Sequence, residues 1–414
     1  KMSEVNNEVP RKRNLIEEES LYPKVEEFNP LLKNTGATPT SLIVAILKNA
    51  RIGQDLTSFD TPTNLLSGRS CLEKLGDAYK PTETLFELFK ETDSEKRMLL
   101  VIKHILENFT TFVANSVSHY KPFNPILGEQ LFMHWEAPDG SIFKFVAEQV
   151  SHHPPISALV IENEKHKFKS NITLGSKITF KGNSVEATFR GYRCISLPHP
   201  TTGEMEHYEL DGDSTTGTGI IIGSARFGFT STMTVKCREH PELIGTVKFS
   251  DVSKVKGKLK AKSSEKSKKF DKKPYRFTGD LLKTITLEDT AQKKKTPWIV
   301  MANINHFQKK MPQLIEMGPL ESRIVWHDVF YGIVKNDQDL ATKHKHYVEN
   351  KQRAKRKERK EKGETWTPLM FNQQSESPNG ILPYFEINEV GIKKLNEIKD
   401  KQKEEMDVDE DDLD

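Results

Sequence analysis

Two adjacent histidines, His152 and His153, stand where a β-strand is expected to end. Residues 143–150 alternate in the manner of a strand. Pro154 and Pro155 cannot donate hydrogen bonds to a sheet, so the strand must stop before them. Neighbouring strand residues face opposite ways, which makes the pair a poor set of ligands for one metal ion. At the rim of a sheet, both imidazoles could turn toward one anion and donate to it, best when protonated. Adjacent histidines alone are most often incidental, and the functional alternative for this pair is phosphate binding.

The elements around this pair have the texture of an all-antiparallel sheet. Between positions 121 and 302, short runs rich in β-forming residues recur roughly every 8–12 residues, with turn residues between them. Many such strands indicate a sandwich or barrel, and a barrel of more than ~8–10 strands leaves an interior that can hold a ligand. The expected strands are 142–150, 157–161, 177–180, 185–189, 219–222, 230–235, 245–249, 281–287 and 298–301.

Two longer segments are typical of helices. Residues 93–110 carry apolar side chains at helical spacing, and Thr92 with Glu95 forms a capping-box pattern before them. Residues 319–362 are also expected to be helical, and the charged stretch from Ala341 onward meets no Pro or Gly until position 363.

The charge is unevenly distributed. The chain of 414 residues is 35% hydrophobic and 29% charged, so part of it is expected to be solvated. A net charge of +3 conceals lysine clusters at 254–273 and 343–362 and an acidic end at 403–414. Ten lysines in residues 254–273 predict a mobile hairpin loop, either simply solvated or attracted to anionic lipid headgroups.

Cysteine usage and hydropathy indicate a cytoplasmic protein. Cys71, Cys194 and Cys237 are too few and too widely spaced for a disulfide framework or a metal site. No run approaches the ~18–20 apolar residues of a membrane span, and no signal peptide opens the chain. Contact with membranes is therefore expected to be peripheral.

One short apolar run stands apart from the rest. After Thr40-Ser41, a plausible N-cap, residues 42–47 are all apolar. They indicate either a core helix or a lid that covers an apolar cavity and touches a membrane when it opens. The candidate lid residues are Leu42, Ile43, Ile46 and Leu47.

The octapeptide Glu148-Gln149-Val150-Ser151-His152-His153-Pro154-Pro155 resembles, letter for letter, the fingerprint of the oxysterol-binding-protein-related family of lipid-transfer proteins. The similarity covers about residues 40–370 in the family's order. The other matching segments are Lys121-Pro122-Phe123-Asn124-Pro125-Ile126-Leu127-Gly128-Glu129, Lys181-Gly182-Asn183-Ser184, Pro319-Leu320-Glu321-Ser322-Arg323 with Trp326 close behind, and Gly53-Gln54-Asp55-Leu56-Thr57 followed by Pro62.

The resemblance implies a binding site for an inositol phosphate headgroup. Lys345, Glu349 and Arg353 lie at i, i+4 and i+8, on one face of a helix. Without the resemblance, this spacing indicates a ladder of ion pairs on a solvated helix. In the family, residues at this spacing reach the barrel mouth, where His152, His153 and Arg353 would hold the ring phosphate. Lys121 would neutralise the diester phosphate, and Lys345 and Glu349 would bind ring hydroxyls. The implied site is Lys121, Asn124, His152, His153, Lys345, Glu349 and Arg353.

The resemblance also implies a fold and two cargoes. We expect an α+β protein built on a large, nearly closed antiparallel barrel that encloses a lipid cavity, with an N-terminal lid and helices and a C-terminal helical region. It would be a short form without a pleckstrin-like domain. We expect a monomer that contacts anionic membranes peripherally. Phosphatidylinositol 4-phosphate would share the cavity with a sterol or phosphatidylserine. The expected segments are a flexible leader 1–36, lid and connection 37–68, helices 69–120, barrel 121–302, C-terminal helices 303–400 and an acidic tail 401–414.

Three other functions remain as alternatives. A lipid sensor or scaffold would bind the same lipids and move little of them. Nucleic-acid binding through the lysine clusters is disfavoured, because they lack interleaved stacking aromatics apart from Tyr347. An enzyme such as a phosphoinositide hydrolase could use Glu148 beside the histidines, but no activated nucleophile or metal set accompanies them, so Glu148 is more simply a structural carboxylate. We expect no enzymatic activity, no cofactor and no metal.

Overall fold

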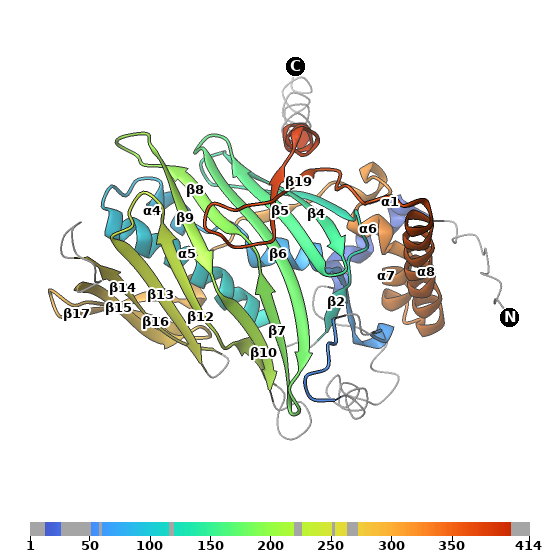
Figure 1. Ribbon diagram of the computed structural model, residues 1–414, viewed down its shortest axis with the longest axis horizontal. Helices are drawn as coiled ribbons and strands as arrows, with labels where there is room; N and C mark the ends of the chain where they lie inside the picture. The colour runs from blue at the N-terminus through green and yellow to red at the C-terminus, as the bar shows by residue number, and fades with distance from the viewer. Residues whose placement is uncertain are drawn as a thin grey trace, which may run out of the picture.

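A single antiparallel sheet of 16 strands forms the body of the computed structural model, which describes residues 13–25, 51–57, 60–115, 120–218, 226–250, 253–262 and 272–398 (Figure 1). The strands are β3 (Gln130–Glu136), β4 (Ile142–His152), β5 (Pro155–Asn163), β6 (Phe168–Phe180), β7 (Ser184–Arg190), β8 (Arg193–Pro198), β9 (Met205–Asp211), β10 (Asp213–Thr218), β11 (Arg226–Phe229), β12 (Thr232–Cys237), β13 (Leu243–Ser250), β14 (Lys254–Ala261), β15 (Lys272–Asp280), β16 (Thr284–Asp289), β17 (Lys294–Val300) and β18 (Gln308–Lys310).

The sheet curls into a barrel that is nearly closed. Its hydrogen-bonded path runs β17-β16-β15-β14-β13-β12-β9-β8-β6-β5-β4-β3-β18. Off this path, β7 pairs with β6 and with β10, and β10 pairs in turn with β11. Within the described residues, no pairing joins the two end strands β17 and β18. The helix α5 (Ser94–Asn115) packs on the inner face, where a Cβ on Gly245 would lie 2.5 Å from the Cδ1 atom of Ile102. The predicted α+β class and nearly closed antiparallel barrel are confirmed.

The lysine-rich segment 254–273, predicted as a mobile hairpin loop, is mostly β-strand where the structure describes it. Residues 254–261 form β14, and residues 272 and 273 begin β15; residues 263–271 lie outside the described part. Val255, Leu259 and Ala261 are buried in the core, whereas the intervening lysines point outward. A period of two separates the charges from the apolar side chains, so the segment can pack in spite of its charge.

The helix expected over 93–110 is α5, with a different cap. The backbone N–H of Lys96 donates to Asp93 Oδ1 at 2.9 Å, so Asp93 is the capping residue and the predicted Thr92–Glu95 box is wrong. Aspartate is among the preferred N-cap residues, and it stands directly before the first helical residue, Ser94.

Several strand boundaries also differ from expectation. The run expected at 281–287 starts as a strand only at Thr284, because Asp280 accepts from the backbone N–H groups of Leu282 and Lys283 and closes a turn. Besides β14 and β15 of the lysine-rich segment, six barrel strands lie outside all the expected runs: β3, β8, β9, β10, β11 and β18. The run expected at 219–222 lies outside the described residues.

The segment expected as helix over 319–362 is divided into α6 (Ser322–Val325), α7 (His327–Val334) and α8 (Gln338–Lys362). The division between α7 and α8 falls at Asn336, which has a positive φ of 59°, and Asp337 then caps α8 by accepting from Leu340 N–H at 2.9 Å. As expected, α8 continues to a glycine: Gly363 has a φ of 68°, a conformation that ends helices readily.

The C-terminal region contains strands as well as the expected helices. β19 (Phe371–Gln374) and β20 (Tyr384–Ile387) form a hairpin against the outer face of the barrel. Phe371 and Phe385 pack there with Val146 and Val160. This strand pair is short and far from the barrel strands in sequence, so its apolar partners are set by the tertiary fold.

Residues 13–25, which were predicted to belong to a flexible leader, form helical turns that pack on the body of the protein. These residues form α1 (Leu15–Glu18) and η1 (Glu19–Val25), and Tyr22 stacks on Phe330 of α7 with ring centroids 4.0 Å apart. The remaining N-terminal elements are η3 (Thr63–Leu65), β1 (Leu66–Ser70), α3 (Cys71–Ala78), α4 (Thr84–Leu88) and β2 (Lys121–Phe123); the short helices η5 (Met301–Asn303) and η6 (Leu314–Glu316) flank β18.

The predicted lid residues Leu42, Ile43, Ile46 and Leu47 lie outside the described residues. The connection that follows them is described from position 51 and runs beside β6. There, Gly53 N–H donates to Phe180 O at 2.7 Å and Leu56 N–H donates to Ile178 O at 2.8 Å. No helix within the described ranges is long and apolar enough to span a membrane.

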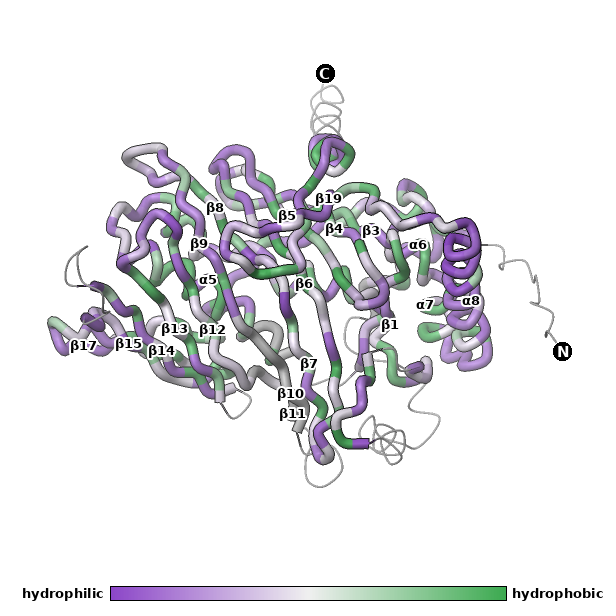
Figure 2. Tube along the Cα trace, viewed as in Figure 1, coloured by the Kyte–Doolittle hydropathy of each residue, from purple (hydrophilic) through white to green (hydrophobic). Residues whose placement is uncertain are grey.

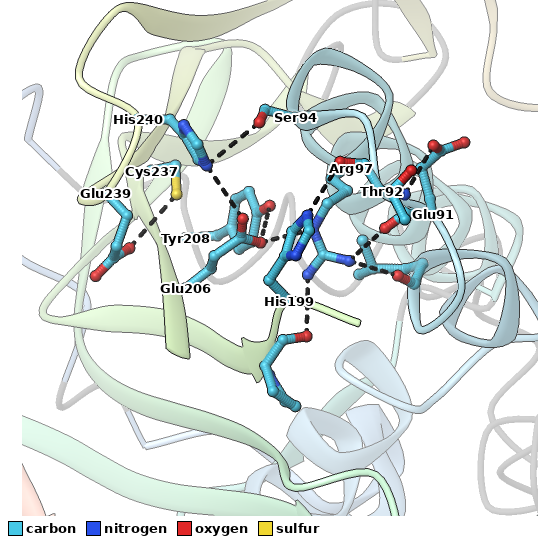
Figure 3. A network of polar contacts seen from close by, with 12 residues as sticks. Glu91, Thr92, Ser94, Arg97, His199, Glu206, Tyr208, Cys237, Glu239 and His240 are labelled. Atoms are coloured by element: carbon cyan, nitrogen blue, oxygen red, sulfur yellow. Dashed lines mark hydrogen bonds and ion pairs between the residues drawn. The ribbon is translucent and has the colours of Figure 1, made fainter. Parts of the chain in front are cut away.

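A buried ion pair joins the start of α5 to the barrel wall (Figure 3). Arg97 Nε donates to Glu206 Oε2 at 2.6 Å, and the same oxygen accepts from the Tyr208 hydroxyl at 2.8 Å. The guanidinium also donates to the carbonyl oxygens of Leu88, Glu91 and Pro198. One arginine therefore fastens α4, α5 and the β8–β9 connection to each other.

Candidate functional site

The β4–β5 hairpin positions the two histidines. β4 ends at His152, His153 and Pro154 form the turn, and Pro155 begins β5, where it pairs with His152. Pro155 fits the first position of a strand because its missing N–H is not needed there. His152 Nδ1 lies 3.0 Å from the carbonyl oxygen of Pro125. A carbonyl can only accept, so Nδ1 carries the proton and Nε2 is left for another partner.

Burial holds both imidazoles toward the neutral form. It lowers the pKa of His152 below the usual range, and the nearby charge of His153 acts in the same direction. Burial and the positive charge of Arg356 likewise lower the pKa of His153. The two rings meet edge to face with centroids 4.8 Å apart. An anion placed beside them would oppose these effects and favour protonation.

Lys121 and Asn124 approach from β2 and the turn after it. β2 pairs in parallel with β1, which brings Lys121 beside the segment before η3, where its Nζ donates to Thr61 Oγ1 at 3.2 Å. Burial lowers the pKa of Lys121, and the neighbouring Lys345 adds to this effect. Asn124 is exposed and free to turn toward a ligand.

One face of α8 supplies the remaining three predicted residues. Lys345 is 6% exposed and forms ion pairs with Glu349 Oε1 at 2.8 Å and with Asp60. Glu349 Oε2 is buried without a hydrogen-bond partner and lies 3.6 Å from Arg353. Arg353 itself is largely exposed, so its guanidinium can move toward a ligand.

The structure brings all seven predicted residues to one pocket of about 590 Å³, which we call the rim pocket. Eight further polar residues line it that the predicted site did not include: Asp55, Thr57, Asp60, Thr61, Ser176, Lys177, Gln352 and Arg356. Arg356 lies one turn after Arg353 and could have been found by helical spacing. Asp60 and Lys177 reach the pocket only through tertiary contacts, for which the sequence holds no local signal.

A buried carboxylate ties the surrounding segments together. Glu129 is 0% exposed and accepts from Ser322 Oγ at 2.7 Å, from Trp326 Nε1 at 2.9 Å and from the backbone N–H of Ile126 at 3.0 Å. Burial raises its pKa. The segment that presents Lys121 is thereby fixed to the helices before α8.

Glu148 has the structural role that was expected as the simpler interpretation. Its two carboxylate oxygens accept from the backbone N–H groups of Leu369 at 2.8 Å and Met370 at 2.7 Å. Burial raises its pKa, and it is not among the residues that line the rim pocket. Glu148 therefore anchors the chain ahead of β19.

The fold and the pocket together define a large antiparallel barrel with a cationic pocket at one rim. The chain belongs to the oxysterol-binding protein family, whose model matches residues 42–396. It is 30% identical over 355 residues to oxysterol-binding protein-related protein 9 of Homo sapiens, covering 81% of this chain and 47% of the relative. It is 29% identical over 350 residues to oxysterol-binding protein 4 of Dictyostelium discoideum, covering 81% and 72%. The chain thus spans about half the length of the first of these relatives.

Two solved structures share the fold. The Osh1 ORD domain in complex with cholesterol aligns with a TM-score of 0.73 at 19% identity, covering 93% of this chain and 97% of that one. The Osh3 ORD of Saccharomyces cerevisiae, in complex with PI(4)P, aligns with a TM-score of 0.60 at 20% identity, covering 82% and 89%.

Proposed function

We propose that this chain is a lipid-binding and transfer protein that carries phosphatidylinositol 4-phosphate and a sterol or phosphatidylserine in one covered cavity and exchanges them between membranes. It would act from the cytoplasm as a monomer, without a cofactor, and would touch anionic membranes peripherally. Family membership supports lipid binding, as do the sterol and PI(4)P complexes of proteins with the same fold.

The observation that carries the proposal is the convergence of charge in the rim pocket. Its lining includes five lysine and arginine side chains, at 121, 177, 345, 353 and 356, against three carboxylates, at 55, 60 and 349. The difference of two positive charges (5 − 3), with two imidazoles beside them, suits a headgroup that carries several negative charges. The buried Oε2 of Glu349 lacks a hydrogen-bond partner and could accept from a ring hydroxyl.

A liposome transfer assay tests the proposal with the variant His152→Ala/His153→Ala. Phosphatidylinositol 4-phosphate binding and transfer should fall by at least about a hundredfold, since each of the two charge-assisted hydrogen bonds contributes about 1.5–3 kcal/mol. Binding of the second lipid should remain, because its apolar body needs the barrel interior rather than the imidazoles.

A matched control replaces His199 and His207, two half-buried histidines that do not line the rim pocket, with alanine. Native mass spectrometry of lipids co-purified from cells would identify the second cargo directly. If the unaltered protein transfers neither sterol, phosphatidylserine nor the phosphoinositide, it is not a lipid-transfer protein.

A lipid sensor that uses the same pocket is the second candidate. It is favoured by the same polar contacts and differs only in kinetics. A sensor should retain its lipid far longer than a collision between membranes lasts, so the dissociation rate compared with the transfer rate separates the two functions.

A further inference from the structure

A second group of positive side chains gathers on the outer face of the sheet, on strands β13 to β17. Strand register places Lys248 opposite Lys256, and Lys258 opposite Arg276. Lys295 of β17 follows in the same row as Arg276, beyond Glu288 of β16. Residues paired across neighbouring strands share one face of a sheet, and the adjacent residues Val247, Val255, Leu259 and Phe277 are buried in the core on the other face. All five cations therefore project from the outer face.

This arrangement is unfavourable for the folded chain by itself. Like charges directly opposite on neighbouring strands destabilise a sheet, and two such pairs lie side by side here. Within the described ranges, none of the five cations has a carboxylate within ion-pair distance. Partial burial lowers the pKa of Lys258, as do the neighbouring charges of Lys260, Lys273 and Arg276. An anion bound among these side chains would remove the repulsion.

The cations surround a hollow of about 440 Å³, which we call the lysine hollow. Its lining contains the small side chains of four threonines, a glycine at position 257 and a single carboxylate, Glu288; the threonines are Thr232, Thr246, Thr278 and Thr286. Threonine hydroxyls can donate to phosphate oxygens. A volume of this size suits a small polar ligand rather than a lone ion.

We propose that the lysine hollow is a second binding site, for a multiply phosphorylated headgroup of the inositol polyphosphate kind. Lys256 and Lys258 are two residues apart on one strand, which separates their Cα atoms by about 7 Å, and Lys258 and Lys295 lie three strands apart, or about 14 Å. This spread exceeds one phosphate and matches several phosphates around a ring.

The site is distinct from the rim pocket and does not rest on the function proposed for it. The two share no lining residue. In Figure 1, β15 and β17 lie at one end of the long axis and α8 lies at the other. The chain could therefore hold a phosphorylated ligand at each end at the same time.

Binding of inositol hexakisphosphate, measured by calorimetry, tests the site in solution, and flotation of vesicles that contain phosphatidylinositol 4,5-bisphosphate tests it on a membrane. Lys256→Gln/Lys258→Gln removes one cation from each like-charge pair. We expect the affinity of this variant to fall by about tenfold or more, for inositol hexakisphosphate if the ligand is soluble and for the vesicles if it is a lipid headgroup. Its melting temperature should stay unchanged or rise, because repulsion is relieved.

Lys236→Gln/Lys283→Gln, which removes two exposed lysines outside the hollow, is the matched control and should bind as the unaltered protein does. All measurements are repeated in the His152→Ala/His153→Ala background, which eliminates the rim pocket as the source. If Lys256→Gln/Lys258→Gln loses affinity for inositol hexakisphosphate in calorimetry, the ligand is a free polyphosphate. If it loses binding only in the vesicle flotation, the ligand is a headgroup on a membrane. Equal binding by the folded hollow variant and its control, in both arms, overturns the proposal.

Discussion

Asp60 contributes one of the three carboxylates that line the rim pocket. Its carboxylate pairs with Lys345 of α8, 285 residues away in the chain. Burial alone would raise the pKa of Asp60, but the hydrogen bond and charge of Lys345 lower it, so the group is ionised at neutral pH. In the ligand-free pocket, Asp60 thus neutralises a cation that an anionic headgroup would otherwise meet.

Asp60→Asn should therefore strengthen headgroup binding. We expect affinity for phosphatidylinositol 4-phosphate to rise about two- to fivefold, or about 0.5–1 kcal/mol, because Asp60 is itself largely exposed and its ion pair is screened. Affinity measured on vesicles checks this, with Asp211→Asn, an exposed carboxylate on β9, as the control. Weaker binding by the Asp60 variant would show that the carboxylate orders the pocket rather than competes for it.

Binding at the rim pocket should also depend on pH. The pKa values of His152 and His153 are lowered by burial in the free protein, and a bound phosphate would raise them. Binding therefore takes up protons, and affinity should increase as the pH falls from about 8 to about 6. Proton uptake measured by calorimetry in buffers of different ionisation enthalpy checks the sign, and the double-alanine variant should lose the effect.

At the scale of elements, α8 contributes more of the predicted site residues than any other helix or strand. One face supplies Lys345, Glu349 and Arg353 to the rim pocket, and its register is set by the Asp337 cap and by burial of Ala341 and Lys345 against the body of the protein. Figure 2 shows the helix as mostly hydrophilic. A helix of this composition is held by its contacts rather than by an apolar stripe.

The hairpin of β19 and β20 is anchored by Glu148, which accepts from the backbone N–H groups of Leu369 and Met370 just before β19. Glu148→Gln replaces one of two accepting oxygens with a donor, which faces a backbone N–H and leaves it unpaired. We expect a loss of about 1–3 kcal/mol and earlier hydrogen exchange over residues 366–387. Glu376→Gln, at an exposed position in the same region, is the control. Unchanged exchange in the Glu148 variant would contradict an anchoring role.

At the scale of the whole molecule, the Arg97–Glu206 pair holds the helices to the barrel (Figure 3). Arg97 is 0% exposed, and Glu206 also receives the Tyr208 hydroxyl and lies 3.1 Å from His240 Nε2. The pair joins segments 109 residues apart, so its loss should affect the barrel as a unit.

Arg97→Ala should cost about 3–5 kcal/mol, because it leaves a buried carboxylate without its partner. Arg97→Leu combined with Glu206→Gln should cost less than Arg97→Ala, since no buried charge is then uncompensated. Chemical unfolding of the three proteins checks the order. A double variant as unstable as Arg97→Ala would mean that the arginine's three carbonyl contacts matter more than the charge pair.

The sequence by itself determined the alternation of the strands, the end of β4 before Pro154, the end of α8 at Gly363 and the seven residues that meet in the rim pocket. Alternation, proline chemistry and capping are local properties, and the octapeptide with its companion segments carried the family. The roles assigned to the seven residues stay a prediction.

Only the tertiary structure decided the rest. The lysines of 254–261 proved to be one face of a strand because β13 and β15 are there to pair with it. Asp60 pairs with Lys345, Glu148 with Leu369 and Glu129 with Trp326, across separations of 285, 221 and 197 residues. Such contacts depend on which elements fold against each other, and a buried carboxylate and a solvated one look alike in a sequence.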